Sequence, residues 1–182
     1  MTAPPEILIR TLADVSAFAQ SARRQAGGDI ILVPVDFSEP SAGALNFAAT
    51  LAQSIHAALI VLHVIHDPAE MPGYYFRNIT RDHLERIDDV AEQTFRDFMV
   101  RMRESRPDCL PLQETGYFMV TGLPVTRILE VAAELKPLMV VMGSQGRTGI
   151  DSIMIGSKAA QIVQLCPFPV TIVKHREQPV EH

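Results

Sequence analysis

The chain has 182 residues, of which 47% are hydrophobic and 20% charged, which is typical of one globular domain and excludes a largely disordered chain. Its 16 basic and 21 acidic residues give a net charge of −5, which argues against a nucleic-acid-binding surface but not against a small anionic ligand. Two cysteines are too few for a disulfide framework or a metal cluster, and no secretory signal or membrane-spanning run of roughly 18 apolar residues is visible. We therefore expect a cytoplasmic protein with neither nucleic acid nor membrane as partner.

Residues 1–28 form a predicted N-terminal extension that is helical. Arg23 and Arg24 stand at the far end of the expected helix, where positive charge favours the helix dipole. Glu6 and Asp14 argue against a targeting peptide, so we expect a helix packed on the domain or on a partner subunit. The apolar stripe of this helix consists of Leu8, Leu12, Val15, Phe18, Ala19 and Ala22.

From residue 29 onward, short apolar runs alternate with helical patterns. Helices are expected from a cap at Ser38, from about Thr80 to Arg106, from Pro124 and from about Ser157. Five strands joined by helices predict a doubly wound, parallel α/β sheet over residues 29–175, followed by a tail at 176–182. The expected strands are 30–36, 58–65, 117–120, 138–142 and 170–173.

The long charged helix that begins near Thr80 has apolar residues at spacings of three and four. This stripe is expected to face the core. Its members are Leu84, Ile87, Val90, Ala91, Phe95, Phe98 and Met99.

Two places lie directly after predicted strands, where doubly wound sheets bind ligands: Asp36 and the loop that starts at Gly143. We favour a ligand role for Asp36 over simple helix capping, because Ser38 is placed for the cap. His63 lies within an apolar strand and is expected to be a core histidine rather than a ligand.

The segment from Gly143 to Lys158 contains four of the ten glycines. Gly156 and Ser157 open a helix whose first N–H groups and positive dipole end suit a phosphate. A flexible connection with ordinary caps is the simpler reading, but two glycine clusters between a buried strand and a helix favour a binding loop. Neither a Walker loop nor a dinucleotide-binding G-x-G-x-x-G is present.

The spacing G-x2-G-x9-G-[ST] resembles the ATP-binding signature of the universal stress protein family. Gly143, Gly146, Gly156 and Ser157 supply it. The resemblance extends over about residues 29 to 175 and includes the segments Val33-Pro34-Val35-Asp36-Phe37-Ser38, Leu62-His63-Val64, Val140-Val141-Met142-Gly143-Ser144 and Cys166-Pro167-Phe168-Pro169-Val170.

This resemblance implies a flavodoxin-like sheet of strand order 3-2-1-4-5, a homodimer through the last strand (about Val170–Val173), and ATP, with or without Mg²⁺, between strands one and four. Gln145 departs from the family, in which His or Arg is commoner there. Arg147 is expected either to reach a phosphate or to be solvated. By resemblance, Pro34, Val35, Asp36 and Val64 border the adenine and ribose, Met142 and Gly143 line the nucleoside, and Gly146, Gly156, Ser157 and Lys158 meet the phosphates.

Three functions stay open at this point. The first is an ATP-binding regulatory or stress-response module that acts on an unidentified protein partner. The second is a slow ATP hydrolase, although no paired acid and base identifies catalytic residues, and Asp36 and Asp151 are only weak candidates. The third is a dimeric interaction module without a nucleotide.

Overall fold

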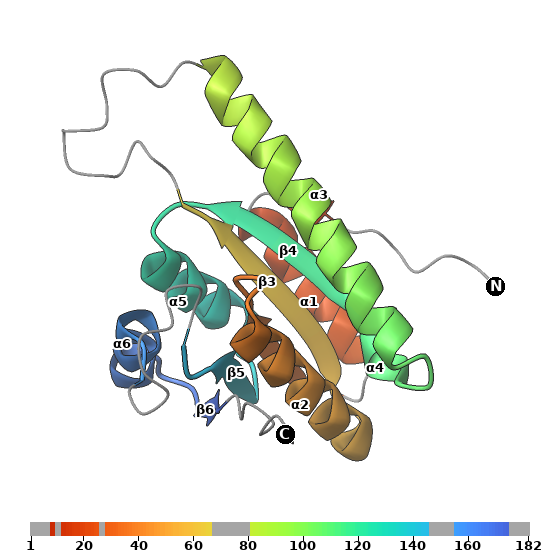
Figure 1. Ribbon diagram of the computed structural model, residues 1–182. Helices are drawn as coiled ribbons and strands as arrows, with labels where there is room; N and C mark the ends of the chain where they lie inside the picture. Colours follow the sequence, from red (N-terminus) through yellow and green to blue (C-terminus); the bar gives the residue numbers. More distant parts are fainter. Residues whose placement is uncertain (1–7, 10–11, 26–27, 67–80, 146–154, 175–182) are drawn as a thin grey trace, which may run out of the picture.

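A computed structural model describes residues 8–9, 12–25, 28–66, 81–145 and 155–174 of the chain. They form one parallel sheet with helices on both faces (Figure 1). The strands are β1 (Leu8–Ile9), β2 (Ile30–Pro34), β3 (Ala58–Ile65), β4 (Gly116–Thr121), β5 (Met139–Gly143) and β6 (Val170–Val173). The helices are α1 (Leu12–Gln25), α2 (Glu39–Ile55), α3 (Arg81–Ser105), α4 (Leu110–Glu114), α5 (Pro124–Leu135) and α6 (Ser157–Leu165).

The strand order across the sheet is β1-β4-β3-β2-β5-β6, and every pairing is parallel. The five strands predicted from the sequence are β2 to β6, and in chain order they lie as 3-2-1-4-5. The predicted doubly wound, flavodoxin-like sheet is therefore confirmed, with the short strand β1 added at one edge. The winding direction reverses between β2 and β5, so their carboxyl ends flank the place where such sheets bind ligands.

The sheet separates two hydrophobic clusters. Ile31 and Val33 of β2 point toward α2, α3 and α4, whereas Ile30 and Leu32 point toward α1, α5 and α6. All five residues of β2 are buried, as expected for a central parallel strand that is covered on both faces.

The start of α2 follows its sequence signals. Ser38 is the N-cap residue, and its side chain accepts a hydrogen bond from the backbone N–H of Ser41 at 3.3 Å. Pro40 lies in the first turn, where a missing N–H costs no helical hydrogen bond. The helix begins where the sequence predicts it to begin.

The long helix α3 contacts the core along its C-terminal half. Phe95, Phe98 and Met99 are buried there, as predicted. Val90 is 67% exposed, so its predicted place on the inner face is wrong. The N-terminal part of the helix projects past the sheet (Figure 1), which explains why Val90 meets no core there; the side chains of the predicted stripe residues Leu84 and Ile87 lie outside the described part of the chain.

The N-terminal extension contributes both β1 and α1. In β1, Leu8 pairs with Tyr117 and Ile9 with Phe118 of β4. The predicted helical stripe began at Leu8, which is a strand residue instead, because the edge of β4 offers backbone hydrogen-bonding groups to a neighbouring strand.

Helix α1 packs on the sheet and on α5. Its residues Val15 and Ala19 are buried, and the ring of Phe18 meets that of Phe118 edge to face, with 5.0 Å between centroids. Arg23 donates hydrogen bonds from Nη2 to the carbonyls of Leu135 and Lys136, and the Lys136 distance is 3.1 Å. The extension is therefore in contact with the domain over most of the length of α1.

Candidate functional site

The residues predicted to bind ATP come from the ends of three neighbouring strands and from the start of one helix. Pro34 closes β2 and Asp36 follows it, Val64 is the next-to-last residue of β3, and Met142 is the next-to-last residue of β5. Ser157 begins α6. Because all the strands are parallel, their carboxyl ends lie at one edge of the sheet, and the described candidates gather there.

Asp36 is tied to the start of α2. Its Oδ1 accepts hydrogen bonds from the Ser38 hydroxyl at 2.5 Å and from the Ser38 backbone N–H at 3.2 Å. The Ser41 hydroxyl donates to the Ser38 carbonyl at 2.9 Å, which completes a small network at the helix start. A carboxylate is stabilised here because the N-terminal end of the helix dipole is positive. Asp36 thus braces α2 and also stands at the strand end where a ligand would bind.

The glycine that ends β5 is required by packing within the protein. A Cβ on Gly143 would lie 2.8 Å from both the carbonyl carbon and the carbonyl oxygen of Pro40. These are backbone atoms of the first turn of α2, so they cannot move aside without shifting the helix. Gly143 therefore allows α2 to approach β5 closely, and the same helix start closes the ends of both β2 and β5.

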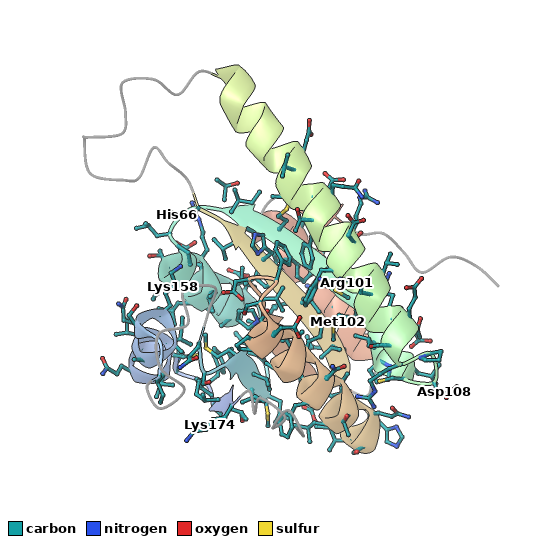
Figure 2. All side chains as sticks on the ribbon, viewed as in Figure 1. His66, Arg101, Met102, Asp108, Lys158 and Lys174 are labelled. Atoms are coloured by element: carbon teal, nitrogen blue, oxygen red, sulfur yellow. The ribbon has the colours of Figure 1, made fainter. Side chains whose placement is uncertain are left out.

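The start of α6 is held beside the end of β5 by one hydrogen bond. The N–H of Gly156 donates to the carbonyl of Ser144 at 2.8 Å. No side chain caps this helix, and its first turn holds no acidic residue. Ser157 and Lys158 are exposed in that turn, and Figure 2 labels the side chain of Lys158. The helix presents its positive end, with first-turn N–H groups that have no partner within the helix, at the same edge of the sheet.

Two predicted phosphate ligands, Gly146 and Arg147, lie outside the described residues. The described chain stops at Gln145, which is half-buried, and resumes at Ile155. The hydrogen bond between Gly156 and Ser144 brings the described residues on either side of this segment together, at the end of β5 and the start of α6.

The strand residues of the site divide between the two faces of the sheet. Val64 and Met142 pack with the cluster under α5 and α6, the side from which α6 begins. Val35 packs in the opposite cluster, and its N–H donates to Leu62 O at 2.8 Å. Its carbonyl oxygen lies 2.8 Å from His63 Nδ1. Val35 thus helps to hold the end of β2 to β3.

No pattern in the sequence predicts the conformation of Phe37 or its contact with His63. Phe37 has φ of +66°, in the left-handed region that bulky residues rarely adopt. Its ring stacks on the His63 ring with centroids 4.1 Å apart. His63 is half-buried, and its ring contacts those of Phe37 and Phe95, as expected for the packed core residue that was predicted. Only the register of β2 against β3 reveals that the two residues meet.

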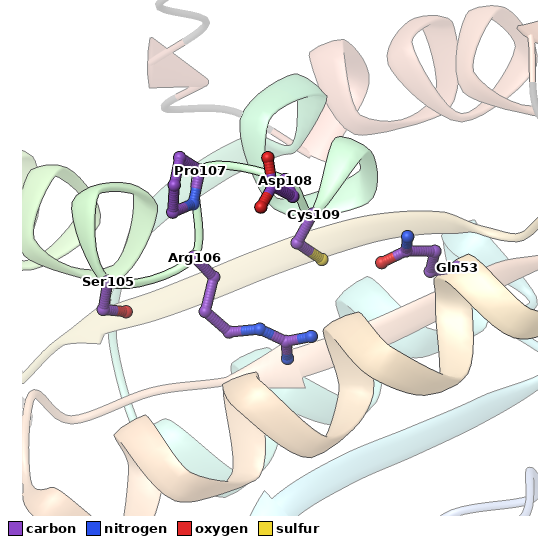
Figure 3. A pocket seen from close by; sticks show the side chains of 6 residues that line it. All are labelled: Gln53, Ser105, Arg106, Pro107, Asp108 and Cys109. Carbon is purple, nitrogen blue, oxygen red and sulfur yellow. The ribbon is translucent and has the colours of Figure 1, made fainter.

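A hollow between α2 and the α3–α4 turn lies away from this edge (Figure 3). There, Arg106 Nη1 donates to the Asn46 carbonyl at 3.0 Å and to Thr50 Oγ1 at 2.7 Å. The thiol of Cys109 lies 3.8 Å from the Ala49 carbonyl oxygen. These contacts fasten the turn to α2. The hollow is lined by Gln53, Ser105, Arg106, Pro107, Asp108 and Cys109.

In the described parts of the chain, no three His, Cys, Asp or Glu side chains come together in a way that could hold a metal ion. Among the helices that the structure describes, none has the length and apolar character needed to cross a bilayer.

The sheet defines a flavodoxin-like α/β protein, and its candidate site lies at the reversal between β2 and β5. A profile of the universal stress protein family matches residues 28–174, and the chain belongs to this family. The universal stress protein encoded in the QAH/OAS sulfhydrylase 3′ region of Thermus aquaticus is 30% identical over 144 residues, which cover 79% of this chain and 97% of the relative.

Two solved structures illustrate the similarity in fold. Universal stress protein UspA from Lactobacillus plantarum is 21% identical with a TM-score of 0.63, and the match covers 80% of this chain and 97% of UspA. The universal stress protein from Archaeoglobus fulgidus in complex with dAMP is 19% identical with a TM-score of 0.54, covering 80% and 97%. The family profile begins after β1 and α1, so both elements lie outside the matched region.

Proposed function

We propose that this universal stress protein binds an adenine nucleotide, with ATP as the first candidate, at the carboxyl edge between β2 and β5, and acts as a nucleotide-dependent regulatory module. The observation that carries the proposal is the start of α6. Gly156 fixes an uncapped helix N-terminus beside the end of β5, where first-turn N–H groups suit a phosphate. The dAMP complex of the Archaeoglobus fulgidus relative supports a nucleotide as the ligand class.

The backbone at Gly156 fits a site that is open to a ligand. Its φ of −59° and ψ of 149° are accessible to any residue. A Cβ there would lie 3.5 Å from the Ser144 carbonyl oxygen, which is ordinary van der Waals contact. The described fold therefore has no need for glycine at this position, in contrast to Gly143. A phosphate bound at the helix start would explain the glycine, because the phosphate would occupy the space that a side chain at position 156 would fill.

The phosphate contacts follow from this geometry. The N–H of Gly156 is used by the Ser144 carbonyl, so the donors that remain for a phosphate are the N–H groups of Ser157 and Lys158 and the Ser157 hydroxyl. The ammonium of Lys158 is unfavourable at the positive end of the helix dipole. A bound anion would offset this repulsion.

The nucleoside contacts come from the strand ends. Val64 is half-buried and Met142 is 8% exposed, on the face of the sheet from which α6 begins. They offer an apolar surface to a purine ring. Asp36 offers a carboxylate to a base, a ribose hydroxyl or a Mg²⁺ ion carried by the phosphates. When bound, the nucleotide would supply a charged ligand whose presence changes the surface of this edge.

Isothermal titration with ATP tests the proposal. We expect wild-type protein to bind, and we expect Gly156→Val to weaken binding by at least about tenfold while the melting temperature stays the same. Gln161→Val, at an exposed position later in α6, is the matched control and should bind like wild type. Equal ATP affinity in Gly156→Val and wild type would overturn the site. Release of ADP by the same samples, compared with Asp36→Ala, measures whether the bound nucleotide is also hydrolysed.

We also propose that the protein forms a homodimer through β6. Among the strands that the structure describes, β6 lies at the edge of the sheet and pairs with β5 alone. The carbonyls of Pro169 and Val173 accept hydrogen bonds from β5 and the residue after it, so by alternation the backbone groups of Ile172 face outward. Val163 and Leu165 of the adjacent α6 are 47% and 60% exposed. An open strand edge beside exposed apolar side chains fits a second copy of the chain.

A further inference from the structure

The turn that follows β2 places Asp36 between two residues that are both held by one side chain of β3. Phe37 has φ of +66°, a conformation that costs free energy in a bulky residue and persists only where the surroundings enforce it. Val35, on the other side of Asp36, is the last residue of this segment to hydrogen-bond with β3 through its N–H. Contacts with other parts of the protein are therefore needed to hold this turn in its observed conformation.

His63 supplies those contacts. Its ring stacks on that of Phe37, with centroids 4.1 Å apart and an angle of 30° between the planes. Its Nδ1 lies 2.8 Å from the carbonyl oxygen of Val35. A carbonyl oxygen only accepts hydrogen bonds, so Nδ1 carries the proton in this contact. One imidazole thus holds the residue before Asp36 by a hydrogen bond and the residue after it by stacking.

The aromatic side chains of α3 complete the enclosure. The centroids of Phe95 and Phe98 lie 5.4 Å and 5.5 Å from that of Phe37. Phe95 also lies 5.9 Å from the His63 ring. Phe37 is therefore packed into the cluster under α3, while Asp36 is engaged with Ser38 at the start of α2. Because Phe37 packs under α3 and Asp36 hydrogen-bonds at the start of α2, the backbone direction between these two residues is fixed.

We infer that His63 is a positioning residue for the nucleotide site: it holds the turn Val35-Asp36-Phe37 so that the Asp36 carboxylate and the start of α2 stay at the ligand-binding edge. The inference rests on the proposed nucleotide-binding function. His63 acts through Val35 and Phe37, and it contacts no ligand in this role.

Three substitutions separate the two contacts of His63. His63→Asn keeps a side-chain N–H donor near the position of Nδ1 and loses the ring. His63→Phe keeps a ring to stack on Phe37 and loses the donor. His63→Ala loses both. The matched control is Val61→Ala, which removes buried side-chain volume from the same strand and the same face without touching the turn.

The first measurement is the dissociation constant for ATP at a temperature where every variant is folded. We expect His63→Ala to bind ATP about tenfold more weakly than wild type. A loss of this size corresponds to the free energy of about one hydrogen bond, here the one that holds Val35 in position. The Asn and Phe variants should fall between the two, and Val61→Ala should bind like wild type despite its lower stability. If His63→Ala binds like wild type, the inference is overturned and the proposed function stands.

The second measurement needs no nucleotide. The three-bond coupling between the amide and α protons of Phe37, combined with the intraresidue nuclear Overhauser effect between the same protons, which is strongest at positive φ, reports its φ, and we expect φ to leave the left-handed region in His63→Ala. A positive φ retained in that variant overturns the inference whatever the affinities are. If wild-type protein binds no adenine nucleotide, the proposed function fails, and this measurement of φ decides whether His63 holds the turn.

Discussion

The ring of Phe18 fills the space that a side chain on Gly116 would need. A Cβ on Gly116 would overlap the tip of the Phe18 ring, with Cε1 and Cε2 each 2.9 Å away. Gly116 begins β4, whereas Phe18 belongs to the extension that lies outside the match to the family profile. The domain and its extension are therefore fitted to each other at this point.

This fit predicts a coupling between the two positions. Gly116→Ala should lower the free energy of unfolding by roughly 1–3 kcal/mol, the usual effect of overpacking a filled core. In a Phe18→Ala background, Gly116→Ala should lower the free energy of unfolding much less, because the ring that the new methyl group would meet is absent. Urea unfolding of the four proteins of this cycle measures the coupling.

If Gly116→Ala lowers the free energy of unfolding equally in the wild-type and Phe18→Ala backgrounds, the predicted contact is contradicted. The coupling also bears on the role of the extension. If Phe18 does not pack on β4 in solution, removing its ring will neither destabilise the domain nor relieve the added methyl group.

The contact of Arg23 with the end of α5 yields a second prediction. Arg23 donates to the carbonyls of Leu135 and Lys136, where the negative end of the helix dipole attracts a cation. Arg23→Met should lower the free energy of unfolding by about 1–2 kcal/mol, since the thioether keeps the packing of the stem and loses the charged hydrogen bonds. Arg24→Met is the control, because Arg24 is exposed on the same helix. Equal unfolding free energies for the two variants would show that Arg23 does not anchor α1.

The parts of the fold that are coded locally could be predicted from the sequence. The apolar run of β2 indicates a strand buried on both faces, and Ser38 marks the start of α2. Features that depend on distant partners could not be predicted. The place of Leu8 depends on the edge of β4, and the exposure of Val90 depends on how far the sheet extends under α3. The short helix α4 also has no amphipathic pattern long enough to reveal it.

The same division applies to the site. The strand ends and the start of α6 were predictable because glycines and an acid follow apolar runs. The reason for Gly143 was not, since the sequence does not show that Pro40 will lie against it. Nor does any local pattern predict a positive φ for Phe37, because its conformation is enforced by His63 on a different strand. Spacing indicates where a site lies, whereas packing decides what each residue does there.

The two glycines of the candidate site are expected to differ in their response to alanine. Gly143→Ala should lower the free energy of unfolding by about 1–3 kcal/mol, because the added Cβ meets the backbone of Pro40. Gly156→Ala should leave it nearly unchanged, since its Cβ meets only ordinary contacts. Chemical denaturation of both variants without nucleotide makes the comparison. A larger loss for Gly156→Ala would show that α6 starts differently from the arrangement described above.

The edge strand β6 supports the last prediction, which concerns the proposed homodimer. The backbone N–H of Ile172 points away from β5, so a proline at this position removes no hydrogen bond of the sheet and is tolerated as edge-strand prolines generally are. It does remove a donor that a second chain would need for strand pairing. Ile172→Pro should therefore shift the protein from dimer to monomer while the circular-dichroism spectrum stays that of a folded α/β protein.

Two further variants make this prediction specific. Ile172→Ala loses a similar amount of side-chain packing but keeps the N–H, so it should remain dimeric at concentrations where Ile172→Pro is monomeric. Thr171→Pro removes an N–H that faces β5 and should destabilise the fold itself, because a ladder hydrogen bond is lost. Sedimentation velocity over a range of concentrations gives the association state of each. An Ile172→Pro protein that is as dimeric as wild type would place the interface elsewhere than on the β6 edge.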